Sequence, residues 1–266
     1  MTPENPADTP TDPPVRTDFG EGVARLTLNN PRRKNAISLE MAALIDDFCV
    51  RVETDPGIGA VVVAAAGAYF CSGADTRDLA SSSADPASPE AVRRTSAVYG
   101  AFVRVGMLPV PTISRVVGGA VGAGLNLALA TDLMAITPET RLESGFLARG
   151  IHPGGGHLSL LGRAVGWSNT IAMAACGLAL TGTEAVTRGL AHLAVPESEL
   201  DARIAELTAP AAADPELTRR VMTSARLELG PPAVSWSSAL EIERGVQMWS
   251  MSRKGEGSWS SRGPGR

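Results

Sequence analysis

Two glycine-rich turns are the parts of this sequence whose residue types point most directly to chemistry. They read FCSGAD at residues 70–75 and GGAVGAG at residues 118–124, and each joins an apolar segment to a helix-forming run. Gly73, Gly122 and Gly124 permit positive φ angles or a close approach of the backbone to a ligand. The first N–H groups of a helix have no partner within that helix, and the helix dipole makes this end positive. If the two turns face each other, two backbone N–H groups can stabilise a carbonyl oxygen that gains negative charge.

Other interpretations of these turns involve packing, phosphate binding or a thiol. The glycines could serve only the tight packing of a strand against a helix. A phosphate loop is not indicated, because neither turn ends in G-K-[ST] and no G-x-G-x-x-G follows the first expected strand. Cys71 has no pairing histidine in the sequence around it, so a nucleophilic role is not expected. Asp75 is expected to cap the helix that follows the first turn.

The elements around the turns are expected to alternate between strand and helix. GVARLTLNN alternates as a strand does, and Ser38 is expected to cap the helix after it. The apolar run GAVVVAAAG predicts a buried strand, AVYGAFVRVGML a helix, and PVPTISRVVGGA a further strand. LASSSADPASPE is expected to be a loop of small residues. The alternation continues to about residue 160 and favours an α/β fold, with helices in the remainder of the chain.

We expect three regions along the chain. Residues 1–16 are rich in proline and acidic residues and are expected to form a disordered tail. Residues 17–195 form the expected α/β core, and residues 196–266 form the expected C-terminal helical region with a flexible tail. A chain of 266 residues can bury one large core of this kind.

Composition and charge argue against several classes of protein. The formal net charge is −4 and the pI is near 5.5, which disfavours a general affinity for nucleic acid. The three cysteines form no C-x-x-C pair and no Cys/His set, so neither a disulfide framework nor a metal site is expected. No apolar run reaches the roughly 18 residues of a membrane-spanning helix, and the N-terminal residues lack the pattern of a signal peptide. The sequence therefore predicts a cytoplasmic protein without a membrane span.

Four motifs taken together resemble a known family. LTLNNPRRKNAIS, AYFCSGAD, VGGAVGAGLNLALATDLMAIT and GIHPGGGHLSLL stand in the order and spacing of the crotonase, or enoyl-CoA hydratase/isomerase, superfamily. The resemblance covers about residues 18–250. It implies a crotonase-like spiral of ββα units with a C-terminal helical trimerisation region, and a homotrimer or hexamer. It also implies an acyl-CoA or enoyl-CoA ligand, with coenzyme A as part of the thioester substrate and no permanently bound cofactor.

The resemblance places the two oxyanion donors on the backbone N–H groups of Ala74 and Ala123. This agrees with what the two glycine turns indicate by themselves. Other residues of the turns that are expected to surround the ligand are Cys71, Gly73, Asp75 and Gly122.

Four cations lie where the resemblance places the phosphates and adenine of coenzyme A. They are Arg32, Arg33 and Lys34 in the PRRKN loop, together with Arg77 after the first turn. Arginine and lysine pair with phosphate oxygens, which gives this cluster a physical role. The alternative is an ordinary solvated, charged loop.

The sequence departs from the family's hydratases at two positions. Those enzymes use two glutamates to hold and deprotonate the water that adds to the enoyl double bond. The first glutamate position is Asn126, which neither takes nor gives a proton at neutral pH, and the second is Phe146, which offers an apolar wall. The chain is thus expected to be an atypical member that does not hydrate efficiently by the two-glutamate route.

Two other side chains are candidates to replace the missing base. Glu143 lies three residues before Phe146, but it could equally be a solvated surface carboxylate. His152 lies beside another glycine turn, and histidine titrates near pH 7, although it could instead be a structural imidazole. Structural roles are expected for His157, His192 and Asp132.

These residues leave two main hypotheses for function. The first is a hydratase/isomerase-type lyase or isomerase, in fatty-acid or related acyl-CoA metabolism, whose oxyanion hole supplies most of the rate. Such a site suits a reaction with few proton transfers, such as a decarboxylation or a slow isomerisation. The second is a non-catalytic acyl-CoA binding protein that retains the ligand site and the oxyanion hole but lacks the acid–base pair. A nucleotide-binding module is disfavoured by the acidic pI and the missing phosphate-loop lysine.

Overall fold

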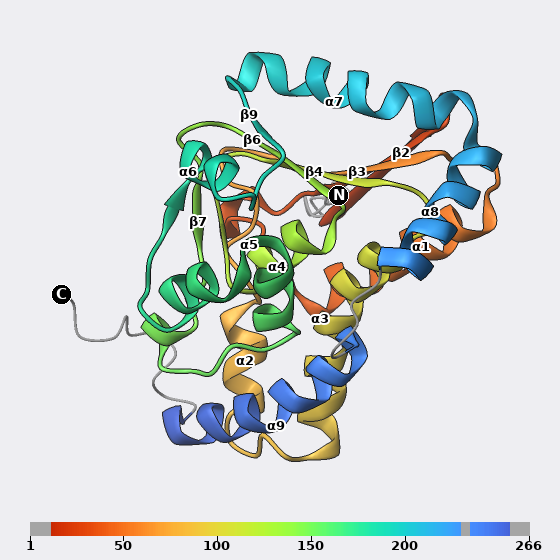
Figure 1. Ribbon diagram of the computed structural model, residues 1–266. Coiled ribbons are helices and arrows are strands. Elements are labelled where there is room, and N and C mark those ends of the chain that lie inside the picture. Colours follow the sequence, from red (N-terminus) through yellow and green to blue (C-terminus); the bar gives the residue numbers. More distant parts are fainter. Residues whose placement is uncertain (1–11, 230–234, 256–266) are drawn as a thin grey trace, which may run out of the picture.

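A six-stranded mixed sheet forms the centre of the protein (Figure 1). The structure is a computed structural model, and it describes residues 12–229 and 235–255. The strands lie in the order β1-β2-β3-β4-β6-β9, in which β1 is antiparallel to β2 and the other neighbours are parallel. Their bounds are β1 Val15–Gly20, β2 Val23–Leu28, β3 Ala60–Ala65, β4 Thr112–Val116, β6 Leu133–Ile136 and β9 Leu193–Ala194.

A second, smaller sheet carries the second glycine turn. It consists of β5 (Gly119–Val121), β7 (Arg141–Glu143) and β8 (Leu180–Thr181). β5 and β7 are parallel, whereas β8 runs antiparallel to β7. β4 of the large sheet and β5 of the small one are separated by only two residues, so the turn after β5 lies beside both sheets.

Helices pack on both sides of the six-stranded sheet. α7 lies across one face of the six-stranded sheet, α1 and α3 pack together away from α7, and α9 runs beside α2 and α3 at the opposite end (Figure 1). The helix bounds are α1 Leu39–Thr54, α2 Thr76–Ser82, α3 Pro89–Met107, α4 Ala123–Ala130, α5 His157–Ala174, α6 Gly182–Thr187, α7 Glu197–Ala213, α8 Pro215–Leu229 and α9 Trp236–Lys254. Two short 3₁₀ helices are η1 Pro31–Arg33 and η2 Leu147–Arg149.

Local sequence signals explain the elements nearest the first turn. The Ser38 side chain accepts a hydrogen bond from the N–H of Met41, which confirms the expected cap of α1. The apolar run of β3 is buried along nearly its whole length, as expected for a central parallel strand covered on both faces. The alternation of strands and helices confirms the predicted α/β fold.

Two predicted boundaries are wrong. β1 begins at Val15, inside the segment expected to be a disordered tail, because Val15 is buried and pairs with Leu28 of β2. The segment expected to be a small-residue loop begins with the second half of α2, because the Asp75 cap starts a helix that continues to Ser82. The predictions for residues 1–11 and 256–266 lie outside the described residues.

Two structural findings concern membrane-spanning helices and metal sites, neither of which is expected from the sequence. Within residues 12–229 and 235–255, no helix is both long and apolar enough to cross a membrane. The same residues contain no group of three or more histidine, cysteine or carboxylate side chains placed to hold a metal ion.

Candidate active site

The two glycine turns meet in the structure. The N–H of Cys71 donates to the carbonyl of Gly119 at 3.2 Å, and the N–H of Val121 donates to the carbonyl of Cys71 at 3.0 Å. A Cβ at Gly124 would lie 2.3 Å from the Cys71 carbonyl oxygen, so the first turn of α4 can pack this closely only with glycine there. A Cβ at Gly73, whose φ is +113°, would lie 3.9 Å from the nitrogen of Ala123. The first turn is therefore adjacent to the N-terminus of α4.

The backbone N–H groups of Ala74 and Ala123 are left available by this arrangement. Ile37 donates its N–H to the Gly73 carbonyl at 2.8 Å and accepts from the N–H of Asp75 at 2.9 Å. Because backbone groups alternate in direction along an extended segment, the intervening N–H of Ala74 faces away from Ile37. Ala123 is the first residue of α4 and its N–H has no acceptor within the helix. Neither N–H donates to another group in the described part of the chain.

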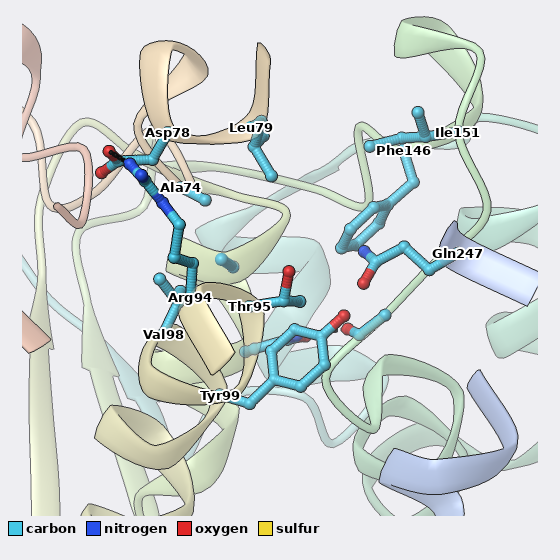
Figure 2. Close-up of a pocket in the computed structure, with 13 residues that line it drawn as sticks. Ala74, Asp78, Leu79, Arg94, Thr95, Val98, Tyr99, Phe146, Ile151 and Gln247 are labelled. Carbon is cyan, nitrogen blue, oxygen red and sulfur yellow. Dashed lines mark hydrogen bonds and ion pairs between the residues drawn. The ribbon is translucent and has the colours of Figure 1, made fainter. Parts of the chain in front are cut away.

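Both alanines line one cavity, which lies among α2, α3, α4, α9 and the loop after β7 (Figure 2). Its walls are largely apolar, with a few polar side chains among them. The lining residues are Ala74, Asp78, Leu79, Arg94, Thr95, Val98, Tyr99, Ala123, Asn126, Phe146, Ile151, Gly154 and Gln247. A concave apolar site with a few convergent polar groups is typical of a small-molecule binding site.

Asn126 is held in a buried hydrogen-bond network on α4. Its Nδ2 donates to the carbonyl of Gly154 at 2.9 Å, and its Oδ1 is 2.7 Å from Nδ1 of His157. Nε2 of His157 is 2.9 Å from the hydroxyl of Ser144. Since Oδ1 can only accept, Nδ1 of His157 carries the proton and Nε2 accepts from Ser144. Each polar side-chain atom of Asn126 and His157 thereby has one partner within the protein.

His157 is neutral in this setting. The residue is completely buried at the start of α5, and burial lowers the pKa of its imidazole from 6.5 to about 3. An imidazole with so low a pKa and both nitrogens hydrogen-bonded is a poor proton acceptor at neutral pH. The network therefore positions Asn126 without supplying a base.

A cluster of cations lies beside the first turn. Asp75 caps α2 through the N–H of Arg77 and pairs with the side chains of Arg33 at 3.0 Å and Arg77 at 3.3 Å. Burial alone would raise the pKa of Asp75, but the hydrogen bonds from Arg77 and the charges of both arginines hold it below its usual value. Lys34 lies over the ring of Tyr69, and Arg32 is exposed. One ionised carboxylate thus fastens two guanidinium groups next to the N–H of Ala74.

Known proteins resemble this chain along most of its length. A model of the enoyl-CoA hydratase/isomerase family matches residues 18–244. A probable enoyl-CoA hydratase of Mycobacterium tuberculosis is 39% identical over 243 residues, which cover 85% of this chain and 93% of that protein. This chain belongs to the enoyl-CoA hydratase/isomerase family.

Two further comparisons concern an isomerase and the fold. A 1,2-epoxyphenylacetyl-CoA isomerase of Escherichia coli is 32% identical over 181 residues, covering 68% of this chain and 69% of that protein. The crystal structure of an enoyl-CoA hydratase from Bacillus halodurans matches with a TM-score of 0.83 at 21% identity, covering 92% of this chain and 98% of that one. These findings place the chain in the crotonase superfamily, as the sequence motifs predicted, and its fold is the crotonase fold.

Of the remaining residues predicted from the sequence, Phe146 lines the cavity, whereas Glu143 and His152 do not. Phe146 forms part of the cavity wall and packs edge-on against His157, with ring centroids 4.9 Å apart. Glu143 is on β7 and pairs with Arg141 at 3.1 Å, and His152 has Nδ1 2.7 Å from the Pro153 carbonyl. Among the described residues, neither Glu143 nor His152 lines the cavity, so the structure gives no support to either as a substitute base.

Three other predicted residues have structural partners, through the side chain in Cys71 and Asp132 and through the backbone N–H in His192. The Cys71 thiol donates to the carbonyl of Asn35 at 3.0 Å, and burial raises its pKa to about 12, so it is no nucleophile. Asp132 accepts hydrogen bonds from the N–H and the hydroxyl of Thr112. His192 is exposed, and its N–H donates to the carbonyl of Met134.

Sequence reasoning missed several residues of the site. Thr95 and Tyr99 line the cavity from α3, and Gln247 lines it from α9. Glu243 of α9 lies behind the cavity wall, where it accepts hydrogen bonds from the backbone at the start of α5. A signal for the α3 pair existed, since a threonine and a tyrosine four residues apart lie on one helix face that is otherwise apolar. No comparable local signal marks Gln247, because α9 reaches the cavity only through the tertiary fold.

Proposed function

We propose that this member of the enoyl-CoA hydratase/isomerase family binds an acyl-CoA thioester and stabilises its enolate oxygen with the N–H groups of Ala74 and Ala123. The observation that carries this proposal is the meeting of two free backbone donors at one apolar cavity. Fixed donors in a site that excludes water stabilise developing negative charge strongly, because they do not have to reorient. The acyl chain would lie against Leu79, Val98 and Phe146.

The cations beside the first turn are proposed to bind the coenzyme A phosphates. Asp75 holds Arg33 and Arg77 together and leaves guanidinium N–H groups of both facing solvent, where a phosphate can approach. Arg32 and Lys34 add exposed positive charge from the same loop. Guanidinium groups bind phosphate oxygens through two parallel hydrogen bonds, which suits a fixed pair of arginines.

The reaction is proposed to be an isomerisation, or another step that needs an enolate and few proton transfers, such as a decarboxylation. Asn126 and Phe146 stand at the two positions where the family resemblance places the hydratase glutamates, and neither can transfer a proton. The relatives include both a probable enoyl-CoA hydratase and a 1,2-epoxyphenylacetyl-CoA isomerase, so the proposal of an isomerase rests on Asn126 and Phe146. A non-catalytic acyl-CoA binding protein is the second candidate. It is favoured because Asn126 and His157 are hydrogen-bonded to groups of the protein itself.

Calorimetric titration tests the binding step. We expect butyryl-CoA to bind with a dissociation constant in the micromolar range, roughly −8 kcal/mol, and to bind more tightly than either coenzyme A or butyrate alone. Both parts of the thioester would then contribute, as the cations and the cavity require. An absence of saturable heat with thioesters of several chain lengths would overturn the proposal.

A hydration assay then separates the two candidates from a conventional hydratase. Wild-type protein should hydrate crotonyl-CoA very slowly, because general acid–base catalysis is typically worth about two to four powers of ten. Fast hydration would show that another group supplies the base. In that case, collapse of the rate in Glu143→Ala or His152→Ala would identify it.

A further inference from the structure

The hydroxyl of Tyr99 is a buried hydrogen-bond donor inside the cavity. Tyr99 is only 6% exposed and projects from α3 beside Thr95, with its hydroxyl toward the wall formed by Phe146 and Gln247 (Figure 2). In the described part of the chain, no group accepts its proton. Leaving such a donor unsatisfied costs stability, so a hydroxyl in this position points to a ligand atom that accepts.

Three polar side chains near Tyr99, those of Thr95, Asn126 and Arg94, have hydrogen-bond or ion-pair partners within the protein. The Thr95 hydroxyl donates to the carbonyl of Ala91 at 2.9 Å, one turn earlier in α3. Asn126 is committed to Gly154 and His157, and Arg94 pairs with Asp78 at 3.0 Å. Burial, aided by the charge of Glu243, raises the pKa of Tyr99, although the charge of Arg244 and the N–H of Gly155 at the phenol oxygen act in the opposite direction. The phenol is therefore protonated and able to donate.

We propose that Tyr99 is a specificity residue that donates a hydrogen bond to an oxygen atom in the acyl part of the thioester. The substrate class is then an oxygenated acyl-CoA, in which the chain carries a hydroxyl, carbonyl or ether oxygen within reach of α3. This inference rests on the proposed thioester site, since it concerns the far end of the same ligand. A purely hydrocarbon chain would fill the cavity while leaving the phenol proton without an acceptor, and sites built around a hydrogen bond discriminate against such analogues.

The test compares pairs of thioesters that differ by a single oxygen. Butyryl-CoA is paired with 3-hydroxybutyryl-CoA and with acetoacetyl-CoA, and phenylacetyl-CoA is paired with 4-hydroxyphenylacetyl-CoA. Each is titrated calorimetrically into wild-type protein, Tyr99→Phe and Tyr69→Phe. Tyr69→Phe is the matched control, because it makes the same chemical change at a ring that does not line the cavity and keeps the ring beneath Lys34.

In at least one pair, wild type and Tyr69→Phe should bind the oxygenated member about tenfold more tightly than its partner. In Tyr99→Phe that preference should disappear, while the unoxygenated thioester binds as well as before. Equal binding within every pair by wild type would overturn the inference and show that the phenol is satisfied within the protein. A preference that survives in Tyr99→Phe would also overturn it. Because unoxygenated thioesters still report the shared site, failure of this inference is distinguishable from failure of the proposed function.

Discussion

Asn126 and His157 hold each other in a fixed geometry. Their contact is buried, each partner has a second hydrogen bond, and Phe146 closes one side of the imidazole. The inertness of Asn126 follows from its residue type and could be predicted from the sequence. Its partners could not, because Gly154 and His157 lie 28 and 31 residues away along the chain and meet Asn126 only in the fold.

The neutral state of His157 predicts a dependence of stability on pH. Its pKa is about 3 in the folded protein and 6.5 when unfolded, so between these values the unfolded chain binds the extra proton. The contribution of His157 is complete above pH 6.5 and is lost as the pH falls toward 3. Between pH 7 and pH 5 we expect a loss of about 2 kcal/mol from this residue. Urea unfolding of wild type and His157→Asn at both pH values measures it.

The His157→Asn variant is the control for other titrating groups. Asparagine keeps a donor near Asn126 but does not titrate, and Glu243, whose pKa is raised by burial, is present in both proteins. The variant should be less stable at pH 7 and should lose less stability on acidification than wild type. Equal losses in the two proteins would contradict a neutral, buried His157.

At the scale of elements, α9 closes the cavity and is fastened to α5. The Glu243 carboxylate accepts from the N–H of Gly156 at 2.7 Å, of His157 at 3.1 Å and of Leu158 at 3.2 Å. These are the unpaired donors at the start of an 18-residue helix, and a carboxylate there also complements the helix dipole. Met248 and Met251 of α9 then pack against Phe146.

Removal of that carboxylate should loosen α9. We expect Glu243→Ala to lower the free energy of unfolding by about 1–3 kcal/mol, because two buried N–H groups and one partly buried N–H group lose a charged acceptor. Hydrogen exchange should accelerate in α9 and in the first turn of α5, with β2 and β3 unchanged. Glu241→Ala is the control, since Glu241 is an exposed residue on the same helix and its pair with Arg244 contributes little. Similar effects of the two variants would contradict the role given to Glu243.

Turns and helix caps, which depend on residues close together in the sequence, could be predicted. Contacts between residues far apart in the sequence could not. Glycine turns, the Ser38 cap and the Asp75 cap each involve residues a few positions apart, so the sequence indicates them directly. The start of β1 depends on pairing with β2, and the proline-rich residues before it favour the prediction of a disordered tail instead of a strand. The contact of Glu243 with α5 spans 85 to 87 residues and has no local pattern.

At the scale of the whole molecule, several large apolar side chains remain on the surface. Trp167 of α5 is 81% exposed, and Leu217 and Val221 lie four residues apart on one face of α8, each 56% exposed. Neighbouring exposed apolar groups, such as Leu217 and Val221 on α8, are typical of surfaces that another protein covers. From the family resemblance we expect that the partner is a second copy of this chain.

We therefore predict a trimer or a dimer of trimers in solution. Multi-angle light scattering at micromolar concentration should give a mass three or six times the 27.5 kDa of the chain. Trp167→Glu should lower that mass if α5 contributes to the interface, because burying the charge is costly. A monodisperse monomer for wild type would contradict this assembly.

The N–H groups of Ala74 and Ala123 are proposed to bind the thioester oxygen, and infrared difference spectroscopy measures this contact at the carbonyl group itself. Butyryl-CoA labelled with ¹³C at the carbonyl is bound to wild type and to Ala123→Pro. Proline suits the first position of α4 and replaces the N–H there by a ring carbon, so calorimetry first establishes that Ala123→Pro still binds butyryl-CoA. The carbonyl stretch should move to lower frequency on binding to wild type, because two donors polarise the bond, and should move less in Ala123→Pro. A bound thioester with an unshifted carbonyl band, or with the same shift in both proteins, would contradict the account.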